Sequence, residues 1–143
     1  MANEVKPIGW GQCSVQDSEL GTYNDIVENS TQLTPQEGSE QEAKIEGGSA
    51  EGRKAQPDIY QLVYNRRIGD ASEVSGCIGF KENVATVQVT PESDSAVGCI
   101  LKNVSRKVTV KFDTTDGLVA VYTYKTKGAK NAQTGLLDDI EFT

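Results

Sequence analysis

The chain has 143 residues, 36% of them hydrophobic, and a formal net charge of −7, which suits one domain with a core and some chain outside that core. The negative charge and the lack of a basic patch with interleaved aromatic residues exclude nucleic-acid recognition as the expected function. No run of about 18 apolar residues is present and the first residues lack the apolar centre of a signal peptide, so we expect no membrane segment and a cytoplasm-like compartment.

The acidic charge is concentrated in the first part of the chain. Residues 1–58 contain 11 acidic and 4 basic residues, a net charge of −7, whereas residues 59–143 contain 10 of each and are neutral. We therefore divide the single predicted domain into an N-terminal segment (1–29), an extended polar arm (30–58) and a β core (59–143).

The N-terminal segment has weak patterns. A short alternation that ends at Val15 is typical of a strand, and the apolar residues Ile26 and Val27 indicate a second, shorter one within a loop.

The arm is much longer than an ordinary connection of about 4–6 residues. Residues 34–37 have the form of a capping box, which predicts a single helical turn. Alternation over residues 40–46 predicts an exposed strand, which the glycines that follow end. Because Leu33 and Ile45 add apolar surface, we interpret this segment as an arm that packs on a neighbouring subunit.

The core begins with a strand at residues 59–68 that is apolar on both faces. Alternation at residues 74–80 and again at 85–89, with a polar turn at 81–83, predicts a hairpin.

Thr90, Pro91 and Glu92 have the form of a helix start. Apolar residues follow on one helical face, and Lys102 and Asn103 are typical of a helix end. We therefore predict one helix at about 91–102.

The strongest hairpin pattern covers residues 108–124, with Gly117 available for positive φ in its loop. Ile140 and Phe142 alternate in a last strand. The predicted fold is mainly β: a β-sandwich or small barrel with one flanking α-helix and a long polar arm.

Little in the sequence indicates catalysis. The chain has no histidine, which excludes Ser-His-Asp and Cys-His systems and most zinc sites. The acid pairs Asp138–Asp139 and Glu40/Glu42 are more simply solvated carboxylates than a metal site or a glycosidase pair. Three cysteines without metal-ligand spacing are typical of reduced, buried small side chains. We expect no enzyme activity, no cofactor and no metal.

Two pairs of adjacent basic residues, Arg66–Arg67 and Arg106–Lys107, border predicted strands. They either flank and solubilise the strand ends or meet the acidic arm of a neighbour. The second interpretation gives a hypothetical subunit interface made of Leu33, Glu37, Glu40, Glu42, Ile45, Glu46, Arg66, Arg67, Arg106 and Lys107.

The layout resembles the bacteriophage tail tube (major tail) protein family. The resemblance is carried by the acidic loop 33–48, the strand 59–66 that it enters, the hairpin after it, the single helix and the closing hairpin 108–124. It implies a β-sandwich or small barrel whose subunits form rings, commonly hexameric, that stack into a hollow tube. It also implies a protein of the virion tail, assembled in the host cytoplasm.

The partners that the resemblance implies are other copies of the chain and other phage tail proteins, while DNA passes through the tube without specific binding. Two other functions stay open. One is a β-sandwich binding module, such as a phage decoration protein or a surface adhesin. The other is an enzyme with carboxylate chemistry, which we do not expect because nothing places two carboxylates together.

Overall fold

The computed structural model describes residues 13–23, 26–27, 30–36, 40–44, 50–55, 59–90, 98–115 and 117–142. Within these ranges only the backbone is described for residues 40–44 and 50–55, Ala71 and Asp113. The mainly β class is confirmed. The strands are β1 (Ser14–Asp17), β2 (Gly21–Tyr23), β3 (Gln32–Gln36), β4 (Glu40–Lys44), β5 (Ala50–Ala55), β6 (Ile59–Arg67), β7 (Gly79–Thr90), β8 (Cys99–Asp113), β9 (Gly117–Lys125) and β10 (Ile140–Phe142).

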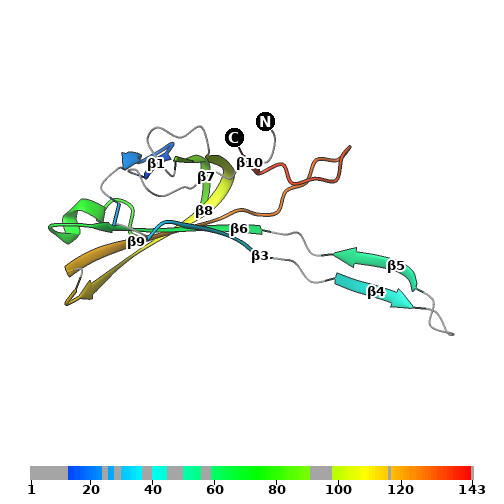
Figure 1. Cartoon of the computed structure of the whole chain (residues 1–143), viewed down its shortest axis with the longest axis horizontal. Helices are drawn as coiled ribbons and strands as arrows, with labels where there is room; N and C mark the ends of the chain where they lie inside the picture. The colour runs from blue at the N-terminus through cyan, green and yellow to red at the C-terminus, as the bar shows by residue number, and fades with distance from the viewer. Residues whose placement is uncertain are drawn as a thin grey trace, which may run out of the picture.

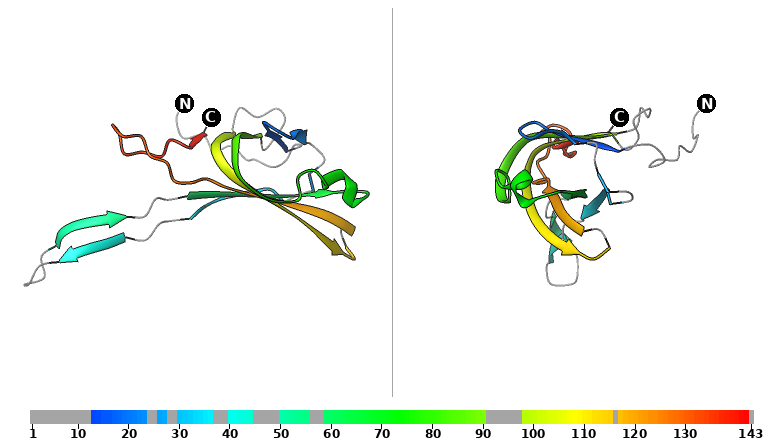
Figure 2. Two further views of the ribbon diagram at one scale, coloured as in Figure 1. Left: turned by 180° about the vertical axis from the view of Figure 1, so that it is seen from behind. Right: turned by 90° about the vertical axis from the view of Figure 1, so that its left-hand side faces the viewer.

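One antiparallel sheet contains most of these strands, in the order β2-β1-β7-β8-β9-β6-β3, and β10 pairs with β8 beside that path. The sheet curls into a half-barrel, which the right-hand view of Figure 2 shows end-on. β4 and β5 pair only with each other, as a hairpin that projects from the ends of β3 and β6 (Figure 1).

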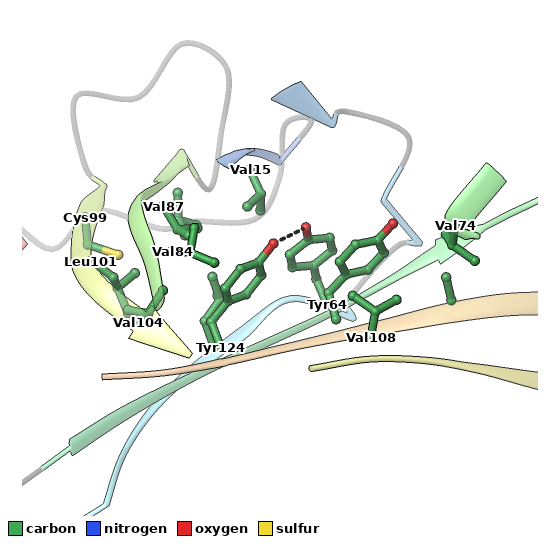
Figure 3. Close-up of a cluster of buried hydrophobic side chains, with 14 of the residues drawn as sticks. Val15, Tyr64, Val74, Val84, Val87, Cys99, Leu101, Val104, Val108 and Tyr124 are labelled. Carbon is green, nitrogen blue, oxygen red and sulfur yellow. Dashed lines mark hydrogen bonds between the residues drawn. The ribbon is translucent and has the colours of Figure 1, made fainter. Parts of the chain in front are cut away.

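The core fills the concave side of the curl. We call this side the inner face and the opposite side the outer face. Because side chains alternate along a strand, every second residue of the central strands lies in the core, including Leu62 and Tyr64 on β6, Tyr122 and Tyr124 on β9, and Val108 on β8. Figure 3 shows Tyr64, Tyr124 and the valines of β7 and β8 directed into one cluster.

The predicted helix at 91–102 is wrong for its described part. Cys99 to Lys102 belong to β8 and pair with β7, while residues 91–97 lie outside the described residues. Cys99 and Leu101 are buried and Ile100 and Lys102 are not. Burial therefore alternates residue by residue, as in a strand, and does not follow the helical spacing. Asn103 does adopt positive φ, 54°, but inside the strand, where it offsets the alternation by one residue.

Two smaller predictions are also wrong. Residues 74–89 do not form a hairpin, because Ala71–Val74 is a 3₁₀ turn (η1) and β7 runs unbroken from Gly79, with an irregularity between Lys81 and Val84 where the turn was expected. Thr34 and Pro35 lie in β3 and do not begin a helical turn, since they pair with β6. The η1 turn is the only helical element among the described residues, so the flanking helix is not confirmed.

Other predictions are confirmed. The strand predicted at 59–68 is β6, and residues 40–44 of the arm form the strand β4. The closing hairpin is β8–β9, with Gly117 at φ 79°, and Ile140 and Phe142 lie in β10. All three cysteines are free and at least half-buried, and burial raises the pKa of the Cys99 thiol to about 11. No helix in the described ranges is long and apolar enough to cross a membrane.

Candidate functional site

The structure divides each basic pair between the two faces of the sheet, because neighbouring residues of a strand point in opposite directions. Arg66 of β6 and Arg106 of β8 lie on the inner face, 9% and 5% exposed, whereas Arg67 and Lys107 are exposed on the outer face. Two of the four predicted basic interface residues are therefore enclosed in their own chain, and only Arg67 and Lys107 remain at the surface.

Arg106 forms a buried ion pair with Asp17. Its Nη1 donates to Asp17 Oδ2 at 2.9 Å, and the Tyr124 hydroxyl donates to the same oxygen at 2.8 Å. The Tyr64 hydroxyl lies 3.2 Å from that of Tyr124, the contact dashed in Figure 3. Asp17 Oδ1 accepts from the backbone N–H groups of Glu19 and Leu20 at 2.8 and 3.2 Å. One carboxylate thus joins the β1–β2 turn to the middle of the sheet.

Arg66 connects β6 to β2 in a similar way. It donates to the Tyr122 hydroxyl at 2.9 Å, and its guanidinium lies 3.8 Å from the centre of the Tyr23 ring. The Tyr122 ring stacks on that of Tyr64, with centroids 4.8 Å apart. A cation over an aromatic face and stacked rings both stabilise a buried contact.

Burial shifts the pKa of the cluster's tyrosines, and Asp17 shifts the pKa of Arg106. Burial raises the pKa of the Tyr64 and Tyr124 hydroxyls far above the usual range, and the nearby tyrosine and Asp17 charges act in the same direction on Tyr124. For Arg106, burial opposes the charged form, but the hydrogen bond and the charge of Asp17 outweigh burial and raise its pKa. The cluster therefore places neutral tyrosines beside a charged Arg106, which suits a brace.

The outer face collects cations that are scattered in the sequence. Lys107 and Lys111 of β8, Lys125 of β9 and Arg67 of β6 are all exposed there. The register confirms the common face: Lys107 pairs with Thr123, Lys111 with Val119 and Lys125 with Ser105, while Val119 also pairs with Arg67. Of these four cations, only Arg67 and Lys107 belong to the subunit interface predicted from the sequence.

Part of β8 has an open edge. β7 begins at Gly79, opposite Val108, so Thr109–Asp113 pairs with β9 on one side and with no described strand on the other. Thr126 N–H donates to Tyr60 C=O, and Ile68 N–H to Leu118 C=O. The backbone N–H and C=O groups of the even-numbered residues of β9 therefore point toward β6, and those of the odd-numbered residues point toward β8.

It follows from this alternation that Thr109 and Lys111 direct their backbone groups toward β9. The N–H and C=O groups of Val110 and Phe112 then point to the open edge of β8. Phe112 is also 78% exposed, the highest value among the large exposed apolar side chains.

β3 forms the opposite end of the sheet, and its far side is also an open edge within the described part of the chain. Tyr60 directs its backbone groups toward β9, so its partner Pro35 directs its own outward. The open edge of β3 thus offers the N–H and C=O of Leu33 and the C=O of Pro35. A proline at this position lowers the pairing capacity of the edge and limits unspecific association.

The remaining predicted interface residues belong to the arm. Leu33 lies in β3 and is half-buried against the core. Glu40 and Glu42 lie on β4, whereas Glu37, Ile45 and Glu46 are outside the described residues. Of the arm's described acidic residues, Glu40 and Glu42 are not brought to the basic residues of β6 and β8, since β4 and β5 form a separate sheet. Within that sheet Glu42 pairs in the register with Arg53 of β5.

Asp139 is a second buried acid, so the prediction of a solvated carboxylate is wrong for Asp139. It is 2% exposed, and its Oδ2 accepts from the consecutive backbone N–H groups of Lys127, Gly128 and Ala129 at 3.1, 2.8 and 3.0 Å. Its backbone C=O accepts from Lys102 N–H at 2.8 Å. This carboxylate holds the loop that follows β9 and aligns the start of β10.

We expect Asp139→Ala to lower the free energy of unfolding by about 3 kcal/mol, because three buried or partly buried N–H groups lose their acceptor at roughly 1 kcal/mol each. Urea denaturation measures the change. Asp138→Ala is the matched control: Asp138 is exposed, and its replacement should change stability by no more than about 0.5 kcal/mol. Equal effects of the two substitutions would contradict the assigned role of Asp139.

Sequence reasoning missed Asp17, Lys111 and Lys125, and it placed Asp139 in solvent. Asp17 follows the alternation of Val15, and an acid in phase with an apolar residue is the signal that could have identified it as buried. In the described ranges, no group of three Asp, Glu, Cys or His side chains is placed to hold a metal ion. Neither the family models nor the curated proteins that were compared match this chain.

Proposed function

We propose that this chain is a structural subunit that assembles, edge to edge, into stacked rings forming a hollow tube, as its resemblance to phage tail tube proteins implies. One observation carries the proposal. The segment β8–β9–β6–β3 of the sheet has an open edge on each side, at Thr109–Asp113 and at β3. Natural proteins cover or interrupt such edges unless another chain pairs with them. Pro35 interrupts the β3 edge only in part, since the N–H and C=O of Leu33 and the C=O of Pro35 stay available to a partner strand.

The directions of the strands favour closure by copies. β8, β9, β6 and β3 alternate in direction, so β3 of one subunit runs antiparallel to β8 of the next when the copies are related by rotation about one axis. Such a head-to-tail contact forms a ring if the rotation closes, and closure removes all of these edges.

The two edges are also staggered along the strands. The centre of β3, Thr34, lies in the row of Gln61, Lys125 and Ser105. The centre of the open stretch, Lys111, lies six residues farther along β8 than Ser105. A constant offset between subunits is what a barrel of tilted strands requires.

Ring closure would place the outer face toward the channel, because the inner face is filled by the core. The β4–β5 hairpin extends beyond the sheet in both views (Figures 1 and 2), where it can reach the next ring. The arm residues Leu33, Glu37, Glu40, Glu42, Ile45 and Glu46 stay candidates for that contact, with Arg67 and Lys107 as candidate basic partners.

In this function the chain has no catalytic task. Its partners are copies of itself and other phage tail proteins at the ends of the tube, and DNA is the cargo. The protein would be assembled in the host cytoplasm and remain in the virion tail.

We expect the purified chain to form rings or tubes as its concentration rises, because each subunit has two complementary edges. Negative-stain microscopy and light scattering after size-exclusion chromatography measure the assembly. A strictly monomeric species at high concentration would overturn the tube and favour the alternative, a β-sandwich binding module such as a decoration protein.

A further inference from the structure

The outer face of the central strands has one sign of charge. Its four cations, Lys107, Lys111, Lys125 and Arg67, are separated by uncharged side chains: Thr109 on β8, Val121 and Thr123 on β9, and Gln61, Val63 and Asn65 on β6. On β8, β9 and β6 no acidic side chain is among those described on this face, and the side chain of Asp113 at the hairpin turn is not described. On the neighbouring strand β7 the exposed Glu82 lies on the same side of the sheet, next to the irregularity after Lys81. No ion pair to a described residue is found for Lys107, Lys111 or Lys125.

An aromatic side chain adds to this surface. Phe80 of β7 pairs with Lys107 in the register and is 68% exposed. Lys107 and Lys125 occupy adjacent strands two residues apart in register, which corresponds to about 8 Å between their backbones. Cations at such spacing around an exposed aromatic ring are the elements of a surface that binds single-stranded nucleic acid without sequence preference.

We propose that the outer face binds the phosphate backbone of a nucleic acid through Lys107, Lys111 and Lys125, with Phe80 as a stacking platform. The inference rests on the proposed function for its location, since ring closure makes this face the wall of the channel and repeats the lysines around it. Contacts to phosphate are independent of sequence and let a protein slide along DNA. They modify the expectation of a conduit that does not touch its cargo: the wall holds DNA weakly and lets it move.

The acidic arm of a second copy is the other polyanion that could cover these lysines. The geometry favours nucleic acid, because the β4–β5 hairpin leaves the sheet along the direction of β3 and β6 and not across the outer face (Figures 1 and 2). The described strands of that hairpin are also balanced in charge, with Glu40, Glu42 and Glu51 against Lys44, Arg53 and Lys54. The chain's net charge of −7 resides elsewhere and lowers the affinity without removing the local attraction.

The test is fluorescence anisotropy with a fluorescein-labelled single-stranded DNA of about 20 nucleotides and its duplex, at roughly 50 mM salt and upward. We compare the full chain with a face variant that combines Lys107→Gln, Lys111→Gln and Lys125→Gln. A control variant combines Lys81→Gln, Lys127→Gln and Lys130→Gln, which removes the same charge from exposed lysines outside the central outer face.

We expect the wild type and the control to bind, and the face variant to bind at least about tenfold more weakly. The slope of log affinity against log salt for the single strand should fall by about 2 in the face variant, because each phosphate contact contributes roughly 0.7. Phe80→Ala should weaken binding of the single strand more than binding of the duplex. Absence of binding by the wild type, or equal loss in both lysine variants, overturns the proposal.

Microscopy of the same samples separates this proposal from the tube. The face variant should form the same rings as the wild type, since its sheet edges are intact. Rings without DNA binding refute the nucleic-acid surface and leave the tube, whereas DNA binding by a permanent monomer refutes the tube and leaves the surface. A face variant that keeps its fold but no longer assembles would identify this face as a contact between copies and overturn the proposal.

Discussion

In the Phe112→Pro variant, ring assembly should be lost while the subunit keeps its fold. The backbone N–H of Phe112 points to the open edge of β8, so no contact with a described residue depends on it, and its side chain is 78% exposed. Proline removes this donor, and its ring obstructs an incoming strand. We expect a change in unfolding free energy of no more than about 1 kcal/mol. Light scattering and microscopy measure assembly, and circular dichroism in urea measures stability.

Two controls define the cause. In Phe112→Thr the N–H remains, so rings should still form; loss of assembly in this variant would mean that the phenyl ring, and not the backbone, makes the joint. In Lys111→Pro the lost N–H is one that faces β9, so stability should fall by roughly 1–3 kcal/mol. If Phe112→Pro assembles like the wild type, the β8 edge is not the subunit contact.

Local sequence pattern was sufficient for the strands whose own residues alternate clearly. The hairpin β8–β9 was predicted because its alternation and Gly117 agree. The strand β6 was predicted because its apolar residues occupy both faces. In both cases the alternation of side chains determines the structure, and that alternation is visible in the sequence.

The sequence pattern gave the wrong element where a short apolar run fits both the helical and the strand period. Ile100 and Leu101 suit a helix with Ala96 and Val97, and Asn103 suits its end. Tertiary pairing with β7 and β10 decided for the strand, and Asn103 uses its tolerance of positive φ to bend it. Long-range pairing of this kind has no local signal, and neither has the single-sign charge of the outer face, which arises only when three strands are set side by side in register.

The same limit applies to the basic pairs. Adjacent basic residues look like one surface feature in a sequence, but a strand separates them by half a turn. Arg67 and Lys107 therefore face solvent, while Arg66 and Arg106 enter the core. The acid that accepts the hydrogen bond of Arg106 comes from a segment far away in the sequence, since Asp17 is 89 residues from Arg106.

Replacement of Asp17 by alanine should lower the free energy of unfolding by about 3–5 kcal/mol, the cost of leaving a buried charge without its partner. Asp17 is the acceptor for Arg106, for the Tyr124 hydroxyl and for two backbone N–H groups of the β1–β2 turn. Arg106 Nε already lacks a partner among the described atoms, so little remains to compensate its charge. Urea denaturation of the variant measures the loss.

An exposed ion pair between Glu19 of the β1–β2 turn and Lys81 of β7 supplies the control. Glu19 pairs with Lys81, but both side chains are more than a third exposed, and exposed pairs contribute about 0–1 kcal/mol. Glu19→Ala should therefore be nearly neutral. If Asp17→Ala does not fold, a cycle of Asp17→Asn and Arg106→Met measures the coupling, which we expect at roughly 1–3 kcal/mol for groups in one network. A coupling near zero would mean that the ion pair does not brace β1 against the sheet, and that the inner face is stabilised by its apolar and tyrosine contacts alone.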